Sequence, residues 1–189
     1  MTSIDIKRRK AREKRKKMRT PRKRRYGNLI IAVPFIVFVG ILILIYGPFG
    51  GSGTATDFTL TDVQGRGTFT LSDHRGKVVV IEFFSIDCSS CHSYFSTLQQ
   101  IRTLYSNKDL TMISILVPWA HDTENLLRTY AAENGIRWYI ALDTSKVTND
   151  YKVRSTPTTV FVDKQGDIAF KQSGIKSIVD LQTKIDSLL

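Results

Sequence analysis

The sequence predicts a domain of the α/β class, a mixed central β-sheet flanked by helices, preceded by one N-terminal transmembrane helix. Three observations lead to this prediction. An uncharged apolar run of 18 residues follows a basic N-terminal tail. Beyond residue 57, segments typical of strands alternate with segments typical of helices. The series then ends with a hairpin and an amphipathic helix, which indicates that parallel and antiparallel strands share one sheet.

Positive charge is concentrated at the N-terminus. Residues 1–28 contain 14 of the 28 Lys and Arg residues but only two acids, Asp5 and Glu13. The net charge of +11 therefore belongs to this tail, and the rest of the chain is close to neutral. A basic segment beside a membrane helix sets the topology of the chain and contacts anionic lipids, so we expect no nucleic-acid partner. Binding of RNA or DNA by the tail is the alternative.

The apolar run covers residues 29–46 and carries no charge. At about 1.5 Å per residue it is roughly 27 Å long, enough to span the apolar core of a bilayer as a helix. The excess of Lys and Arg before it predicts a single-pass protein of the cell membrane, with residues 1–28 in the cytoplasm and the remainder outside. The alternatives are a cleaved signal peptide, whose apolar region is usually shorter, and a buried helix of a soluble domain.

The rest of the chain divides into a Gly-rich linker at residues 47–56 and a globular domain at residues 57–189. Short strand-like segments at 58–60 and 68–71 precede a continuous apolar run at 78–84, which is typical of a central strand buried on both faces. The further elements, in chain order, are a helix at 89–105, a strand at 110–117, a helix at 123–134, a strand at 138–142, a short helix at 145–151, a hairpin of strands at 158–162 and 168–170, and a helix at 175–189.

The sequence has two cysteines, Cys88 and Cys91, where the central strand is expected to lead into a helix. The N-terminus of a helix stabilises an anion and lowers the pKa of a thiol there. We therefore expect Cys88 to be the attacking thiolate and Cys91, one turn later, to resolve a mixed disulfide. Disulfides persist outside the cytoplasm, and a C-x-x-C pair is too short to stabilise a fold usefully, so the pair is predicted to be redox-active.

Several segments resemble the thioredoxin superfamily. Residues 80–91 resemble its active-site region, and residues 151–163, which include Thr-Pro-Thr around Pro157, resemble its cis-proline strand. Residues 57–80 resemble the TlpA-like or redoxin branch, whereas Glu-Phe-Phe-Ser at 82–85 resembles the DsbA branch. A lone C-x-x-C is a weak signal, but its combination with the proline segment is specific, and the resemblance covers roughly residues 57–189.

The resemblance implies a thioredoxin-like fold and a thiol–disulfide oxidoreductase that requires no cofactor. Pro157 matches the cis-proline beside the active-site disulfide, and the backbone of Thr156 is expected to pair with a substrate polypeptide. Glu82 matches the buried acid that transfers protons to and from the second cysteine, and burial is expected to raise its pKa. The implied partners are protein thiols or disulfides outside the cytoplasm and a membrane-bound or exported redox partner.

The motif departs from the superfamily pattern at its centre. Asp87 replaces the tryptophan that usually precedes the first cysteine, and a carboxylate that is close to Cys88 and desolvated would oppose formation of the thiolate. The two middle residues are Ser89 and Ser90, neither the Gly-Pro of typical reductants nor the Pro-His of typical oxidants. The direction of the reaction therefore does not follow from the sequence.

Other functions fit parts of the same motif. Followed by His92, the cysteines match C-x-x-C-H, the attachment motif of c-type haem, although a buried Val-rich strand before the motif is atypical of a small cytochrome. Cys88 and Cys91 with His74, His92 or His121 suggest a copper-binding or metallochaperone protein, although such thioredoxin-like proteins resemble C-x-x-x-C. His92 is expected to be a partly exposed helix residue, whose charge would favour the thiolate. A non-catalytic thioredoxin-like binding module is the last alternative.

Overall fold

The computed structural model describes residues 53–118 and 123–189. The chain divides into two compact units, Met1–Pro48 and Phe49–Leu189, and the described residues belong to the second. The predicted basic tail and the predicted transmembrane run at 29–46 lie outside the described residues. Within the two described ranges, no helix combines the length and the apolar character that crossing a membrane requires.

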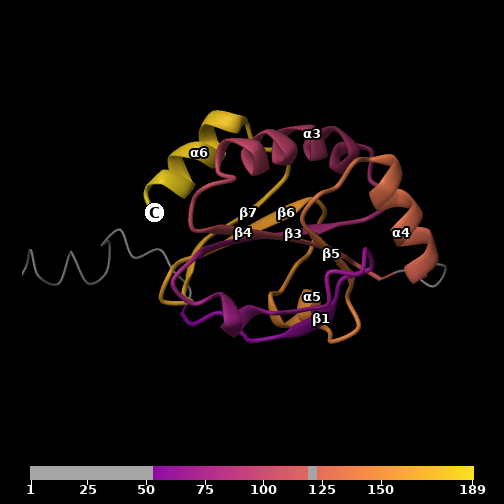
Figure 1. The fold of residues 1–189 in the computed structure, drawn as a ribbon, viewed down its shortest axis with the longest axis horizontal. Coiled ribbons are helices and arrows are strands. Elements are labelled where there is room, and N and C mark those ends of the chain that lie inside the picture. Colours follow the sequence, from indigo (N-terminus) through magenta and orange to yellow (C-terminus); the bar gives the residue numbers. More distant parts are fainter. Residues whose placement is uncertain (1–52, 119–122) are drawn as a thin grey trace, which may run out of the picture. The chain divides into compact units, whose positions relative to one another are not determined.

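The centre of the domain is a five-stranded mixed sheet in the order β5-β4-β3-β6-β7 (Figure 1). Its middle strand, β3 (Val78–Phe84), is parallel to β4 (Leu110–Leu116) and antiparallel to β6 (Thr158–Val162). At one edge β5 (Tyr139–Leu142) is parallel to β4, and at the other β7 (Ile168–Ser173) is antiparallel to β6. The predicted mixed sheet is thereby confirmed, because parallel and antiparallel pairs meet at β3.

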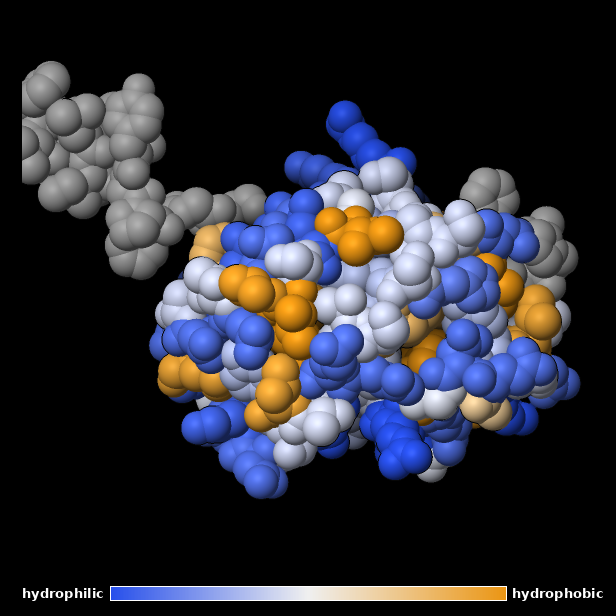
Figure 2. All heavy atoms as spheres, turned by 90° about the horizontal axis from the view of Figure 1, so that it is seen from above, coloured by the Kyte–Doolittle hydropathy of each residue, from blue (hydrophilic) through white to orange (hydrophobic). Residues whose placement is uncertain are grey.

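Helices and a small second sheet cover the two faces of the central sheet (Figure 1). The helices α3 (Ser89–Leu104) and α6 (Ile178–Asp186) pack together on one face, and α4 (Glu124–Glu133) shares their hydrophobic core. The elements of the other face are β1 (Thr59–Thr61), β2 (Thr68–Thr70), the 3-10 helix η1 (Leu71–His74) and the short helix α5 (Val147–Asp150). Seen from above α3 and α6, the surface is mostly hydrophilic with separate small hydrophobic patches (Figure 2).

The side chains of β3 alternate between two hydrophobic cores. Val80 and Phe84 belong to the core under α3, α4 and α6, whereas Val79, Ile81 and Phe83 belong to the core on the opposite face. Successive side chains of a strand point to opposite faces. The side chain of Glu82 therefore points toward α3, and its carboxyl group lies on the side of the core under α3, α4 and α6.

Several boundaries differ by a few residues from those expected from the sequence. The sequence predicts that the last helix begins at residue 175, but it begins at Ile178, because Ser177 and Asp180 form a reciprocal capping box that ends the preceding loop. Packing also begins before residue 57, within the segment expected to be a linker. Thr54 forms a β-bridge with Asp167, and Ala55 is buried. The structure at Thr54 and Ala55 depends on contacts with residues far away in the sequence, so the local sequence pattern does not predict it.

Candidate active site

The first cysteine lies at the N-terminus of α3, directly after the loop that follows β3. Cys88 is the N-cap residue of the helix, with an extended backbone, and its amide donates a hydrogen bond to the carbonyl oxygen of Ser85. The backbone N–H of Cys91 points back and donates to the sulfur of Cys88 at 3.1 Å. The first amides of a helix have no partner within the helix, so a negative charge on this sulfur is stabilised.

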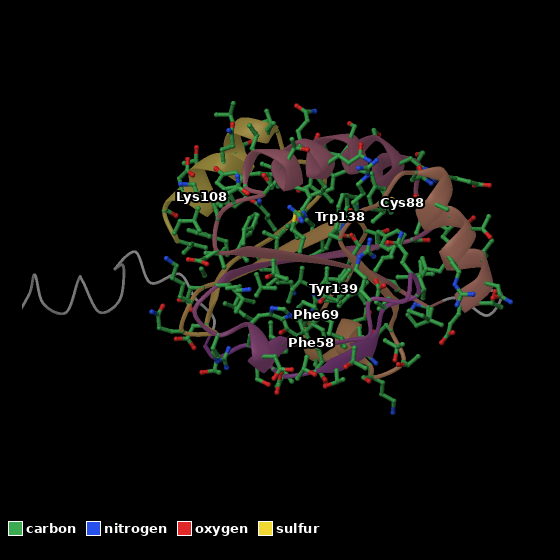
Figure 3. The ribbon with its side chains drawn as sticks, viewed as in Figure 1. Phe58, Phe69, Cys88, Lys108, Trp138 and Tyr139 are labelled. Atoms are coloured by element: carbon green, nitrogen blue, oxygen red, sulfur yellow. A yellow bond between two sulfur atoms is a disulfide. The ribbon has the colours of Figure 1, made fainter. Side chains whose placement is uncertain are left out.

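The two cysteines form a disulfide with a Cα–Cα distance of 5.2 Å, yet their surroundings differ. Cys91 is completely buried in the core under α3, whereas Cys88 is partly exposed at the end of the domain where α3 begins (Figure 3). The hydroxyl of Ser90 lies 3.2 Å from the sulfur of Cys88. An incoming thiol can therefore reach Cys88, while Cys91 is shielded from a second substrate molecule.

Glu82 is buried on the face of β3 that points toward α3. The hydroxyl of Ser114 donates to its Oε2 at 2.6 Å, and the indole N–H of Trp138 donates to the hydroxyl of Ser114 at 2.8 Å. The other oxygen, Oε1, has no hydrogen-bond partner among the described residues. Burial raises the pKa of Glu82 to about 8, and the hydrogen bond from Ser114 opposes this rise only in part. Glu82 can thus hold or release a proton near neutral pH.

A groove of about 480 Å³ runs beside Cys88. Cys88 and Thr156 both line it, together with Val117, Val153 and Arg154. The bond between Thr156 and Pro157 is cis, Pro157 is buried, and its carbonyl oxygen accepts a hydrogen bond from the amide of Gly174. Of the residues predicted from the sequence, Cys88 and Thr156 therefore lie at the surface of the groove, whereas Pro157 is buried beside it.

Asp87 and His92, which flank the two cysteines in the sequence, differ in their surroundings. Asp87 is exposed and lines the groove next to Cys88. His92 is exposed on α3, and its Nε2–H donates to the carbonyl oxygen of Ile86 at 2.8 Å. The hydroxyl of Tyr130, on α4, shares a hydrogen bond of 3.3 Å with Nδ1 of His92. His92 therefore links the loop before Cys88 to both helices.

The histidines considered for copper do not come together in the described part of the chain. His74 belongs to η1, on the opposite face of the sheet from α3, and His121 lies outside the described residues. Across residues 53–118 and 123–189, no three His, Cys, Asp or Glu side chains are grouped as metal ligands would be.

Sequence reasoning missed several residues of the site. Ser114 donates to Glu82 and Trp138 donates to Ser114, whereas Val117, Val153 and Arg154 form part of the groove. A signal existed for Ser114, which is a small polar residue inside the apolar run of β4 and pairs with Glu82 in the sheet register. Nothing in the sequence signalled Trp138, because its approach depends on how β5 lies against β4.

The chain is similar to known redox proteins over most of this domain. Residues 52–171 match the model of the AhpC/TSA family. The thiol-disulfide oxidoreductase ResA of Geobacillus kaustophilus is 27% identical over 136 residues, which cover 71% of this chain and 76% of ResA. The thioredoxin-like protein YneN of Bacillus subtilis is 26% identical, with 70% of this chain and 76% of YneN covered.

Solved structures show the same fold. The exposed lipoprotein thioredoxin of Streptococcus pneumoniae superposes with a TM-score of 0.62 at 26% identity, over 70% of this chain and all of that one. A thiol:disulfide interchange protein of the thioredoxin family from Chlorobium tepidum superposes with a TM-score of 0.64 at 19% identity, over 71% of this chain and 94% of that one. These similarities confirm the thioredoxin-like fold expected from the sequence.

Proposed function

The chain belongs to the AhpC/TSA family and is a thiol–disulfide oxidoreductase, and we propose that it is anchored in the cell membrane and exchanges disulfides with protein substrates outside the cytoplasm. The observation that carries the disulfide exchange is the contrast between the two sulfurs. Cys88 is partly exposed at a helix N-terminus and accepts the N–H of Cys91, whereas Cys91 is fully buried. This contrast supports Cys88 as the nucleophile and Cys91 as the resolving cysteine.

In the direction that reduces a substrate, the Cys88 thiolate attacks one sulfur of a substrate disulfide. The substrate S–S bond breaks, a mixed disulfide forms, and the other substrate sulfur leaves as a thiolate that takes up a proton. Cys91 then loses its proton and attacks the sulfur of Cys88, which forms the Cys88–Cys91 disulfide and releases the second substrate thiol. The two substrate sulfurs are reduced and the two cysteines are oxidised. Oxidation of a substrate is the same sequence in reverse.

We assign to Glu82 the role of proton acceptor for Cys91. A thiol in an apolar core resists ionisation, so its deprotonation requires a base within the same core. Glu82 points into that core, and its Oε1 has no hydrogen-bond partner among the described residues. A pKa of about 8 keeps the carboxyl group mostly protonated at pH 7, yet leaves an ionised fraction that can accept the proton.

The groove beside Cys88 supports binding of an extended polypeptide. The backbone next to Thr156 lies in the wall of the groove, where a substrate segment can pair with it in the manner of an added strand. Val117 and Val153 offer an apolar surface, and the exposed Arg154 adds a positive charge. A substrate with an apolar side chain near its cysteine and an acidic residue beyond it fits this lining.

The membrane part of the proposal rests on the sequence of the first 46 residues. Its test is a reporter that is active only outside the cytoplasm, fused after Leu189 in the full chain. We expect activity of the exterior reporter and none from a cytoplasmic reporter at the same position. The opposite pattern would show that the orientation is wrong and would leave the thiol chemistry untouched.

The chemistry is tested on the full chain in mild detergent, with insulin as the disulfide substrate. We expect Cys88→Ala to abolish exchange, and Cys91→Ala to accumulate a mixed disulfide between Cys88 and insulin that dithiothreitol releases. Ser93→Ala, on the exposed side of α3, serves as the control and should keep full activity. Full exchange activity in the Cys88→Ala variant would refute the mechanism. Measurement of the reduction potential against glutathione then assigns the direction.

A further inference from the structure

A second pocket lies near the end of the sheet at which β3 and β4 begin, whereas the disulfide follows the other end of β3. Figure 3 labels Lys108, two residues before β4, and Cys88 at opposite ends of the domain. The pocket has a volume of about 270 Å³, and we call it the basic pocket. Its ionisable lining residues, apart from Tyr139, are all basic: Arg66, His74, Lys77, Arg102 and Arg137.

The charge of the basic pocket is poorly balanced by the domain itself. Arg66 forms an ion pair of 3.4 Å with Asp62, but the carboxylate of Asp62 also accepts three backbone N–H groups, including that of Ile140 in β5. The other three permanent cations, Lys77, Arg102 and Arg137, have no carboxylate within 4.0 Å among the described residues. Convergence of like charges is unfavourable unless a counter-charge is bound.

We propose that the basic pocket binds a compact anion carrying two or more negative charges, namely a phosphate or diphosphate group. The planar donors of Arg102 and Arg137 suit the oxygens of a phosphate, which can accept several charge-assisted hydrogen bonds at once. A single carboxylate would leave most of the positive charge unbalanced. The volume far exceeds the need of one bound water molecule and admits a group of several heavy atoms. The ligand is a phosphate compound of the solution or the phosphomonoester headgroup of an anionic lipid, since a phosphodiester carries only one negative charge.

His74 and Trp138 provide local reporters, because both line the basic pocket. The imidazole of His74 stacks on the ring of Phe69 at 4.5 Å, and its Nδ1 lies 3.5 Å from the hydroxyl of Thr111. Burial, reinforced by the charge of Lys77 and opposed by that of Asp73, lowers the pKa of His74. A bound phosphate would favour the protonated imidazole and so change its NMR signal at constant pH.

The experiment titrates the full chain with sodium pyrophosphate in mild detergent at constant ionic strength. The readout must be local, because the basic tail at residues 1–28 also attracts anions. NMR signals of the Trp138 N–H groups and of the His74 ring are therefore followed in chain labelled at Trp and His. We expect saturable shifts of both residues. Arg102→Gln with Arg137→Gln should raise the midpoint concentration by about tenfold or more, since the loss of one charge-assisted hydrogen bond already weakens binding by about tenfold.

The matched control removes two other charges, by Lys146→Gln with Lys176→Gln, and should leave the midpoint within about twofold of the original, because neither residue lines the pocket. Insulin exchange should be unchanged in both double variants. Absence of shifts at Trp138 and His74, or an unchanged midpoint in the Arg102 and Arg137 variant, would overturn the proposal. Repetition in phosphatidylcholine nanodiscs with and without phosphatidic acid, whose headgroup is a phosphomonoester, identifies the source. A higher midpoint with phosphatidic acid identifies the lipid headgroup, and equal midpoints identify a soluble phosphate compound.

Discussion

The buried carboxyl group of Glu82 makes the stability of the domain depend on pH in a definite direction. Its pKa is about 8 in the folded protein and 4.5 as an ordinary glutamate. Between these values the folded state holds a proton that the unfolded state has lost. The stabilising contribution is therefore complete below about pH 4.5 and is lost as the pH rises through about 8.

A difference of one bound proton between the folded and unfolded states changes the free energy of unfolding by about 1.4 kcal/mol per pH unit. Over the whole window this amounts to an upper figure of about 5 kcal/mol, which is a large part of the stability of an ordinary domain. The substitution Glu82→Gln removes the titration while the amide oxygen still accepts the hydrogen bond from Ser114, so this variant should lack the slope.

The assay is urea unfolding of the full chain in mild detergent with the disulfide intact, followed by tryptophan fluorescence at several values between pH 5 and 8. The unfolding free energy of the unmodified chain should fall toward pH 8, and the difference between it and the Glu82→Gln variant should change by about 1 kcal/mol per pH unit. The control is Glu133→Gln, at an exposed position of α4, which should keep the original slope. Parallel pH profiles for the Glu82→Gln variant and the unmodified chain would refute the assigned burial and protonation of Glu82.

Three other variants test single contacts. Ser114→Ala removes the hydrogen bond that opposes the shift of Glu82, so the pKa of Glu82 should rise further and the onset of exchange should move to higher pH in a pH–rate profile. Leu98→Ala creates a cavity beneath α3 and should lower the unfolding free energy by about 2–5 kcal/mol in urea titrations, without a change in reduction potential. Arg154→Glu reverses a charge in the groove, so kcat/KM should fall for a peptide disulfide with an acidic residue near its cysteine and rise for its basic counterpart; equal kcat/KM changes for both peptides would exclude a role in recognition.

The elements near the disulfide could be predicted because their patterns are local. A continuous apolar run marks β3 as buried on both faces, and the interruption at Glu82 marks an acid that must be paired or protonated. Its orientation also follows from position alone, since residues 80, 82 and 84 share one face of the strand. The place of Cys88 follows as well, because the run ends four residues before it and a helical pattern begins directly after it.

The contacts that complete the site depend on strand order and register instead. Ser114 meets Glu82 because β4 lies parallel to β3 in one particular register, and a shift of one residue would point Ser114 to the opposite face. Trp138 reaches Ser114 only because β5 adds beyond β4, so that β3, β4 and the residue before β5 contribute to one chain of hydrogen bonds. No spacing within any one of these segments contains that information.

The basic pocket likewise depends on contacts between distant segments, so the net charge of this domain does not predict it. The globular part is close to neutral, so its composition gives no sign of an anion site. The cations come from the β1–β2 turn, η1, the residue before β3, the last turn of α3 and the loop before β5. The right-handed parallel connections return the chain to the same end of the sheet after each helix, so residues just before successive parallel strands become neighbours. Lys77, before β3, and Arg137, before β5, are therefore brought to the same end of the sheet by topology, although they lie far apart in the sequence.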